Sequence, residues 1–386
     1  MNNPLCIFNE IFNQFPKNQK VNCISCSLFK LKKGYKFFNK YIWGLKNVKR
    51  VANKLNFYLL LFIDDTIYND KKIYNAVKHH IYDRKTIIIK YSCPKFKNDE
   101  GNHRGLFGTL IRFFPMFNFP NNNFNIVFVM DVDYNPENED YDKRYIVMYQ
   151  LLKKYNADIL LHQYFGKRMP QWTEKNKPSF IANKIVSQKK IDYHVIVDYL
   201  NELLDEKSKI YKKVFETTKN SLMYQNISYI DPAFNYGVDE YFLSDILYDY
   251  LIKNKYNVVY LVIYDIFSCI QVKYNLYKHD KLKDEVEKFI RFISDNNNDS
   301  IPSIYKHIKS ILNNDNMNIT DEERQIINKT YSYIKQLNSD KNYSLFSKDE
   351  IKYILQHNNT KASKDIIKKD KIIVELPFNI FPNKLV

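Results

Sequence analysis

Two carboxylates stand directly after an apolar segment in the first half of the chain. Residues 125–130 (NIVFVM) are typical of a central strand that is covered on both faces, and Asp131 and Asp133 follow them. In a strand, residues i and i+2 point to the same side about 7 Å apart, so both carboxylates can face one ligand. Two like charges held together favour a divalent cation that prefers oxygen ligands, so the pair predicts a Mn²⁺ or Mg²⁺ site. Alternatively, the acids open a surface loop, because residues 135–137 (NPE) beyond them are turn-like.

Three of the seven glycines in the chain precede this strand within eight positions: Gly101, Gly105 and Gly108. The pattern predicts an amphipathic helix in which Gly105, Gly108, Thr109 and Arg112 share one face, opposite a face of leucine, isoleucine and phenylalanine. Glycine in a helix costs up to about 1 kcal/mol relative to alanine, so such a face needs a reason. It indicates either close backbone packing, with Arg112 paired to an acid, or room for a ligand whose phosphates meet Arg112.

The helix, strand and acidic pair together resemble the core of GT-A-type glycosyltransferases. The residues that carry the resemblance are 108–117 (GTLIRFFPMF) and 125–135 (NIVFVMDVDYN), and the nearest likeness is to the glycogenin and galactosyltransferase-like group. Residues 234–243 (FNYGVDEYFL) are similar to the Gly-x-Asp-Gln-x-x-Leu segment of many such enzymes, with Glu240 where Gln is usual. The C-terminal part has no HxxGxxKPW-type metal motif, which leaves a third protein ligand to the metal unassigned. The resemblance covers roughly residues 20 to 265.

The resemblance implies an α/β fold with a Rossmann-like, mostly parallel sheet flanked by helices. It places a GT-A-like catalytic domain in residues 1–270 and a helical C-terminal region in residues 271–386. The implied reaction is transfer of a sugar from a nucleotide-diphospho-sugar to a hydroxyl of a glycan or protein acceptor, with Mn²⁺ or Mg²⁺ as cofactor. Nucleic acid is a less favoured partner under this interpretation.

The resemblance also implies roles for individual residues. Asp131 would contact the ribose or the metal, and Asp133 would hold the metal against the diphosphate. Asp239 or Glu240 would orient or deprotonate the acceptor hydroxyl, and Asp239 is otherwise a candidate helix N-cap. The residues expected to line the nucleotide are Arg112, which would neutralise the leaving group, with Gly108, Thr109, Asp131 and Ser27.

Hydrophobic periodicity predicts the elements that would position these residues. Residues 1–20 read as irregular and residues 27–29 as a loop after the first strand. Three apolar strands alternate with two amphipathic helices, which predicts a parallel sheet with right-handed crossovers. The expected strands are 21–25, 57–63, 86–91, 125–130, 157–163 and 258–264, and the expected helices are 35–54, 71–82, 145–155, 193–204 and 235–251.

Other polar residues fall near the ends of these strands. Asp64 and Asp65 form a second acidic pair, but they lack the i, i+2 spacing, so we expect a turn or helix cap there. His103 and Arg104 could contact phosphate at the start of the glycine-containing helix, although a histidine in a polar loop is more often solvent-exposed. Trp172 is a candidate for stacking on a sugar ring or for ordinary packing.

Composition places the chain among globular proteins of basic character. The 386 residues carry a formal charge of +16, with 45% hydrophobic and 16% aromatic residues. The abundance of Asn, Lys, Ile and Tyr is typical of an AT-rich genome, such as that of a large DNA virus. The charge favours polyanions, so an alternative function is a catalytically degenerate, basic binding or scaffold module for nucleic acid or an anionic surface. A metal-dependent nuclease is less favoured, because no further acidic and lysine cluster accompanies the acidic pair.

Five cysteines are too sparse for a disulfide framework, so we expect reduced thiols and a reducing compartment. The N-terminus lacks the basic and apolar regions of a signal peptide, and no segment reaches the roughly 20 apolar residues of a membrane helix. These features predict a cytoplasmic protein, in the host cytoplasm if the source is a virus.

Overall fold

A computed structural model describes residues 5–16, 19–30, 38–99, 101, 103–119, 123–132, 140–163, 180–218, 234, 237–264, 321, 325 and 372–377. The chain divides into two compact units, Met1–Leu261 with Ile366–Val374 and Val262–Asp365 with Glu375–Val386. Every residue of the candidate site lies in the first unit. Most of the second unit, and with it most of the predicted helical C-terminal region, lies outside the described residues.

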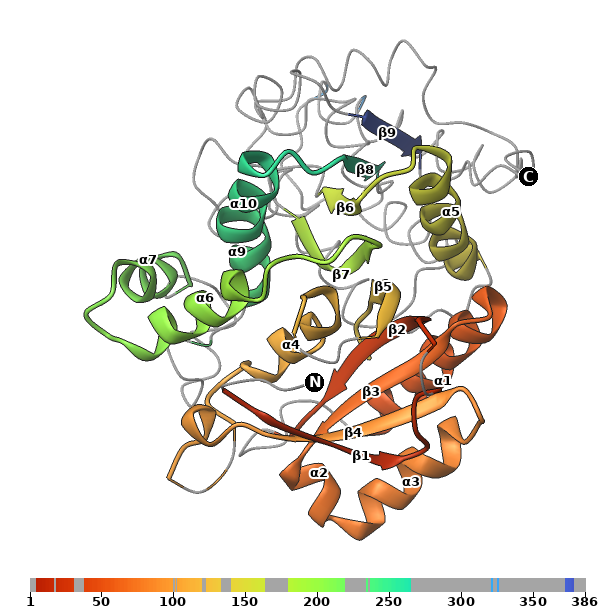
Figure 1. The fold of residues 1–386 in the computed structure, drawn as a ribbon, viewed down its shortest axis with the longest axis vertical. Helices are drawn as coiled ribbons and strands as arrows, with labels where there is room; N and C mark the ends of the chain where they lie inside the picture. The colour runs from red at the N-terminus through yellow and green to blue at the C-terminus, as the bar shows by residue number, and fades with distance from the viewer. Residues whose placement is uncertain are drawn as a thin grey trace. The chain divides into compact units, whose positions relative to one another are not determined.

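The described strands form one mixed sheet with helices on both sides, so the fold is α/β (Figure 1). The order across the sheet is β1-β4-β3-β2-β5-β7-β6-β8-β9. The bounds of the strands are β1 (Ile7–Phe12), β2 (Val21–Leu28), β3 (Tyr58–Asp64), β4 (Thr86–Ser92), β5 (Phe124–Val129), β6 (Ile159–Gln163), β7 (Phe180–Ser187), β8 (Val258–Tyr264) and β9 (Ile372–Pro377).

The centre of the sheet is parallel, as the alternation of strands and helices predicts. β2 pairs in parallel with β3 on one side and with β5 on the other, and β3 pairs in parallel with β4. The register places Ser25 of β2 opposite Leu60 of β3 and Val129 of β5. The carboxyl ends of these four strands therefore lie at one edge of the sheet, where ligands of open α/β sheets bind. Beyond this centre the pairing is antiparallel, between β1 and β4, β5 and β7, and β6 and β7.

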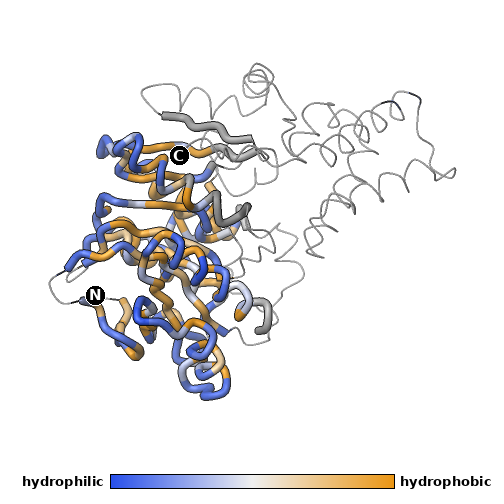
Figure 2. The backbone as a smooth tube through the Cα atoms, turned by 90° about the vertical axis from the view of Figure 1, so that its right-hand side faces the viewer, coloured by the Kyte–Doolittle hydropathy of each residue, from blue (hydrophilic) through white to orange (hydrophobic). Residues whose placement is uncertain are grey.

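Helices cover the sheet on both sides (Figure 1). α1 packs against α3 and α5, whereas α6 packs against α7 and against the π-helical turn η4 (Phe242–Leu247). The helix bounds are α1 (Phe38–Leu55), α2 (Asp65–Asn69), α3 (Lys71–Ile81), α4 (Gly108–Ile111), α5 (Asp140–Lys154), α6 (His194–Leu204), α7 (Lys209–Thr218), α9 (Val238–Tyr241) and α10 (Tyr248–Lys253). Apolar and polar stretches alternate along the backbone of this unit, as amphipathic elements around a core require (Figure 2).

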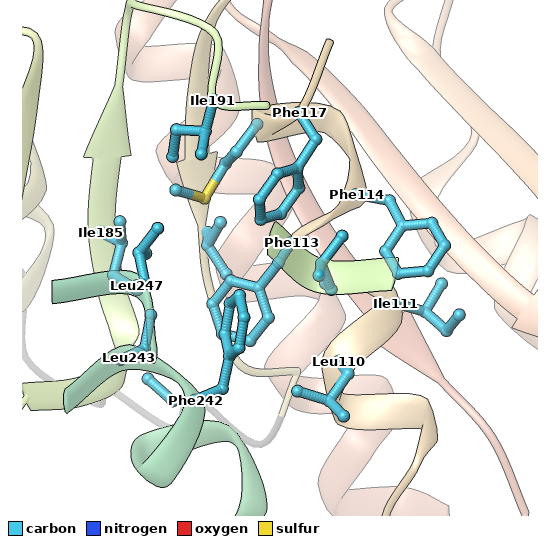
Figure 3. Close-up of a cluster of buried hydrophobic side chains, with 14 of the residues drawn as sticks. Leu110, Ile111, Phe113, Phe114, Phe117, Ile185, Ile191, Phe242, Leu243 and Leu247 are labelled. Carbon is cyan, nitrogen blue, oxygen red and sulfur yellow. The ribbon is translucent and has the colours of Figure 1, made fainter. Parts of the chain in front are cut away.

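The core joins segments that are distant in the chain. The segment from α4 through the 3-10 turn η2 (Phe114–Met116) faces β7 and η4, and its side chains form one apolar cluster with theirs (Figure 3). The buried residues of this cluster include Leu110, Ile111, Phe113, Phe114, Phe117, Ile185, Ile191, Phe242, Leu243 and Leu247. This packing places the end of α4 beside α9 and the end of β5.

Three local predictions from the sequence are wrong. The expected irregular leader contains the edge strand β1, whose apolar residues do not alternate with polar ones and none of whose residues is buried. The expected loop at residues 27–29 begins later, because Ser27 and Leu28 belong to β2. The expected long amphipathic helix is only α4, because Gly105 has a positive φ of 49° and Pro115 lies in the separate turn η2.

Among the helices that the structure describes, none has the length and apolar character needed to cross a membrane.

Candidate functional site

Arg112 lies at the centre of a buried ionic cluster. Its side chain is only 4% exposed, and it pairs with the carboxylates of Asp131 and Asp239. Nη2 donates to Asp239 Oδ2 at 2.7 Å, and Nη1 contacts Asp131 Oδ1 directly. Asp131 is 31% exposed and Asp239 is 9% exposed, so the cluster reaches solvent through Asp131. Three segments that are far apart in the chain therefore meet at one guanidinium.

Two serines of β2 position this cluster. Ser25 Oγ donates to the carbonyl oxygen of Arg112 at 2.6 Å, and Ser27 Oγ donates to that of Gly108 at 2.7 Å. The carbonyl of Ser25 accepts from the backbone N–H of Met130 at 3.0 Å, immediately before Asp131. All of these bonds are buried, where an unsatisfied polar group is costly, so β2 holds α4 and the end of β5 in register with each other.

Gly108 serves close packing in the structure. A Cβ atom built on this residue would lie 2.3 Å from a ring atom of Phe29, so only glycine fits there without movement of the ring. The neighbouring Thr109 is partly buried, and its Oγ1 donates to the carbonyl oxygen of Leu106 at 2.9 Å. The sequence left packing and ligand binding open for this face, and at Gly108 the observed contact is packing.

Asp239 and Glu240 occupy the first turn of α9. The N-cap is Gly237, in the left-handed conformation with φ of 94°, so the alternative role of Asp239 as an N-cap is wrong. Burial raises the pKa of Glu240 well above its ordinary range, and the negative charge of Asp239 and a hydrogen bond to that carboxylate raise it further. The raised pKa favours the protonated form of Glu240, beside the Asp239 carboxylate that pairs with Arg112.

A second polar cluster lies at the carboxyl ends of β3 and β4. Asp64 caps α2, as predicted, and accepts from the backbone N–H of Ile67 at 3.1 Å and from the hydroxyl of Thr66. His103 Nε2 lies 3.4 Å from Asp64 Oδ2 and 3.0 Å from the hydroxyl of Tyr91. His103 is buried, so the expectation of a solvent-exposed histidine is wrong.

The environment shifts both ionisable groups of this second cluster toward their neutral forms. Burial lowers the pKa of His103 to about 3, with a further contribution from the charge of Lys97. Burial raises the pKa of Asp64 to about 6, against the hydrogen bonds from Thr66 and Ile67. Because His103 is neutral at physiological pH, its contact with Asp64 is not an ion pair.

Asp65 faces a different set of partners. Its carboxylate contacts the ammonium of Lys97 directly, lies 3.6 Å from that of Lys90, and accepts from Ser92 Oγ at 2.7 Å. Although partial burial acts in the opposite sense, these hydrogen bonds and charges lower the pKa of Asp65. In the second acidic pair, Asp64 is therefore a buried helix cap and Asp65 belongs to a network of ion pairs near the surface. Both roles stabilise the fold.

A column of stacked rings connects the two clusters. The ring centroids are 4.9 Å apart for Phe29 and His103, 5.6 Å for His103 and Phe107, and 4.0 Å for Phe107 and Phe96. Phe29 also covers Gly108. Sequence reasoning did not find this column, because its members follow no common period and meet only in the fold. The only sequence feature that pointed to such packing was the number of phenylalanines near Gly105 and Gly108.

Of the residues selected from the sequence, the structure brings together Arg112, Asp131, Asp239 and Glu240, with Ser27, Gly108 and Thr109 on the supporting segment. Asp133 and Trp172 lie outside the described residues. Within the described part of the chain, no group of three or more His, Cys, Asp or Glu side chains is arranged to hold a metal ion. Asp131 offers the carboxylate oxygen chemistry that Mn²⁺ and Mg²⁺ prefer, so the described half of the acidic pair fits such an ion.

Comparison of the chain with protein-family profiles, with curated proteins and with solved structures finds no match.

Proposed function

We propose that this protein is a metal-dependent glycosyltransferase that transfers a sugar from a nucleotide-diphospho-sugar to a hydroxyl of a glycan or protein acceptor. The observation that carries the proposal is the bridge from Asp131 through Arg112 to Asp239. The two sequence segments that resemble GT-A-type enzymes are far apart in the chain, and this bridge joins a carboxylate of each to one guanidinium. Such convergence is expected of a site and is not required of two unrelated surface loops.

The position of the bridge supports the same proposal. Asp131 follows β5, which pairs with β2 in the parallel centre of the sheet. The serines of β2 hold the Arg112 segment at this same edge. An open parallel sheet with polar groups at its carboxyl edge, extended by an antiparallel strand, is compatible with a GT-A-type domain.

The residues of the bridge have distinct tasks in the proposal. Asp131 and Asp133 would hold the metal ion, which when bound supplies a Lewis acid for the diphosphate of the leaving group. Arg112 fixes Asp131 and Asp239 beside each other and offsets their repulsion, so its main task is positioning and not direct neutralisation of phosphate. Asp239 accepts a hydrogen bond from a sugar or acceptor hydroxyl, and protonated Glu240 donates one. Ser27, Gly108 and Thr109 shape the supporting segment.

The test is a panel of nucleotide sugars, assayed for hydrolysis and transfer in the presence of Mn²⁺. We expect one member to be turned over and, by linkage, to raise the Tm of the protein. Asp133→Asn should lower turnover by at least about a hundredfold and abolish the Mn²⁺-dependent Tm shift. The matched control is Asp198→Asn, which removes a 72% exposed carboxylate on α6 and should change neither quantity. Full turnover in Asp133→Asn, or no response to any nucleotide sugar, would overturn the proposal.

A further inference from the structure

Two neighbouring helices of the first unit contain no carboxylate. α1 (FNKYIWGLKNVKRVANKL) and α3 (KKIYNAVKHHI) lack Asp and Glu entirely, although the chain has 43 of them among 386 residues. Acidic side chains are favourable in the first turn of a helix, where they interact with the macrodipole, and neither helix uses one there. The basic residues in the last turns interact favourably with the helix dipole, but the dipole does not explain the complete absence of acidic residues.

The outward face of α1 combines a tryptophan with cations. Trp43, Lys46, Arg50 and Lys54 stand at positions i, i+3, i+7 and i+11, which share one side of a helix. Trp43 is one of two tryptophans in the chain and is 60% exposed. The ammonium of Lys46 lies 4.5 Å from the centroid of its ring. Leaving so large an aromatic surface in water is costly, and core packing does not explain it.

α3 extends this cationic face. It packs beside α1, and Lys49 of α1 pairs with Asp83 after α3 at 3.1 Å (Figure 1). Lys72 and His79 are exposed on α3, and His80 next to them lies within electrostatic range of Lys46.

The two acids that flank α3 are engaged in structure. Asp70 caps the helix by accepting from the backbone N–H of Ile73 at 3.2 Å, and Asp83 faces Lys49. The surface formed by Trp43, Lys46, Arg50, Lys54, Lys72 and His79 is here termed the α1–α3 face.

We propose that the α1–α3 face binds the surface of an anionic lipid bilayer. Lysine and arginine side chains on the face would lie along the negatively charged headgroups, and their apolar stems would follow the boundary toward the acyl chains. Tryptophan is favoured at that boundary, because its ring is apolar and its N–H can still donate a hydrogen bond. The exposure of Trp43 among cations is what this partner requires.

The features of the α1–α3 face favour a bilayer over a nucleic acid. Proteins that bind single-stranded nucleic acid stack successive bases on several aromatic side chains along a basic groove. The α1–α3 face is the outer side of two packed helices and carries a single exposed tryptophan. Binding to a duplex depends on phosphate contacts and gives no role to an exposed indole ring. This inference does not depend on the proposed enzymatic function.

The test measures co-sedimentation of the full chain with vesicles of phosphatidylcholine alone or with added phosphatidylserine. We expect binding only to the anionic vesicles and weaker binding at higher salt. The variant Lys46→Gln/Lys72→Gln should weaken binding at least about tenfold, because each lysine near an anionic surface contributes roughly fivefold. In the Trp172→Phe background, the fluorescence of Trp43 should shift to shorter wavelength when anionic vesicles are added. If that background does not fold, co-sedimentation of Trp43→Ala replaces it, with weaker binding expected.

The matched control is Lys207→Gln/Lys253→Gln, which removes the same charge from exposed positions outside the α1–α3 face. It should retain the affinity of the unmodified chain. If the two double variants lose affinity for anionic vesicles equally, binding depends only on net charge. If the unmodified chain does not bind anionic vesicles, the inference has no basis. Tighter binding of a single-stranded oligonucleotide, lost in Lys46→Gln/Lys72→Gln, would assign the face to nucleic acid instead. Each of these three results would overturn the proposal.

Discussion

At the scale of single residues, Arg112 combines charge with almost complete burial. Removing a guanidinium from water is compensated only by close partners, and the carboxylates of Asp131 and Asp239 provide them. The sequence left two roles open for Arg112, pairing with an acid or meeting the phosphates of a ligand. The structure shows the pairing, and its partner Asp239 lies on α9, at a distance in the chain that no local pattern spans.

Replacing Arg112 should therefore destabilise the fold strongly. We expect Arg112→Met to lower the free energy of unfolding by about 3–5 kcal/mol, because Asp239 would be left buried without a counter-charge. Urea denaturation measures this change. As a control, Lys189→Met breaks a partly exposed pair with Asp158 and should cost no more than about 1 kcal/mol. A similar decrease in the free energy of unfolding in the two variants would contradict the assignment of a buried ionic bridge at Arg112.

His103 and Asp64 should make opposite contributions to the pH dependence of stability. The unfolded chain takes up a proton at histidine near pH 6.5, whereas folded His103 does so only near pH 3, so this group removes stability as the pH falls between those values. Folded Asp64 takes up its proton near pH 6 and the unfolded chain near pH 3.8, so this group adds stability as the pH falls through that range. The two contributions partly cancel between about pH 4 and 6.

Single variants should expose each contribution. His103→Gln should lose less stability than the unmodified protein when the pH is lowered from 7 to 4, because the histidine penalty is gone. Asp64→Asn should lose more, because the opposing contribution is gone. Thermal unfolding at a series of pH values measures both, and parallel curves for all three proteins would show that neither group is buried as described.

At the scale of elements, the contact between Phe29 after β2 and Gly108 of α4 sets how closely that helix approaches the sheet. The two serines of β2 bond to carbonyls of the same segment, so the approach is also fixed by hydrogen bonds. A side chain at position 108 would force the ring of Phe29 aside and strain these bonds.

Gly108→Ala should accordingly destabilise the protein by about 1–3 kcal/mol through overpacking, despite the higher helix propensity of alanine. Combining Phe29→Ala with Gly108→Ala should cost less stability than the sum of the two single losses, because the new methyl group then has space. A double-mutant cycle of the two substitutions, followed by chemical denaturation, measures this coupling. Additive effects would mean that the two residues do not touch.

At the scale of the whole molecule, a disulfide bond joins the edge strand β1 to its neighbour β4. Cys6 before β1 and Cys93 after β4 form a disulfide, and 87 positions of the sequence separate them. The expectation that all the cysteines remain reduced is wrong for this pair, because the antiparallel pairing of β1 with β4 brings the two residues together. Because disulfides persist mainly in oxidising compartments, this bond does not favour the reducing compartment that we expected. The cytoplasmic location remains a prediction.

Loss of this disulfide should lower stability by about 2–4 kcal/mol, because the unfolded chain would no longer be constrained by a long loop. We expect a reductant to lower the Tm of the unmodified protein and to have no effect on Cys6→Ser/Cys93→Ser, whose Tm should match that of the reduced protein. Alkylation without reduction, read by mass spectrometry, should leave Cys6 and Cys93 unlabelled. Labelling of both would contradict the bond.

The strands of the parallel centre and the helices between them could be derived from the sequence by itself, whereas β1, β7 and α7 were not among the expected elements. Hydrophobic periodicity is a local property, so the strands and crossover helices of the parallel centre, and the cap formed by Asp64, lie where the pattern predicts. The acidic residues after β5 and the arginine after α4 were recognisable for the same reason. The structure tests neither the metal nor the sugar, and these remain proposals.

Only the tertiary structure decided which of these residues meet. The bridge from Asp131 through Arg112 to Asp239, the burial of His103 beside Tyr91 and the pairing of Cys6 with Cys93 all join positions that are distant in the chain. Strand β1 was missed because its sequence, IFNEIF, has paired apolar residues instead of the alternation that is typical of a half-buried strand. Contacts of this kind depend on how the sheet orders its strands, and hydrophobic periodicity within each segment contains no information about that order.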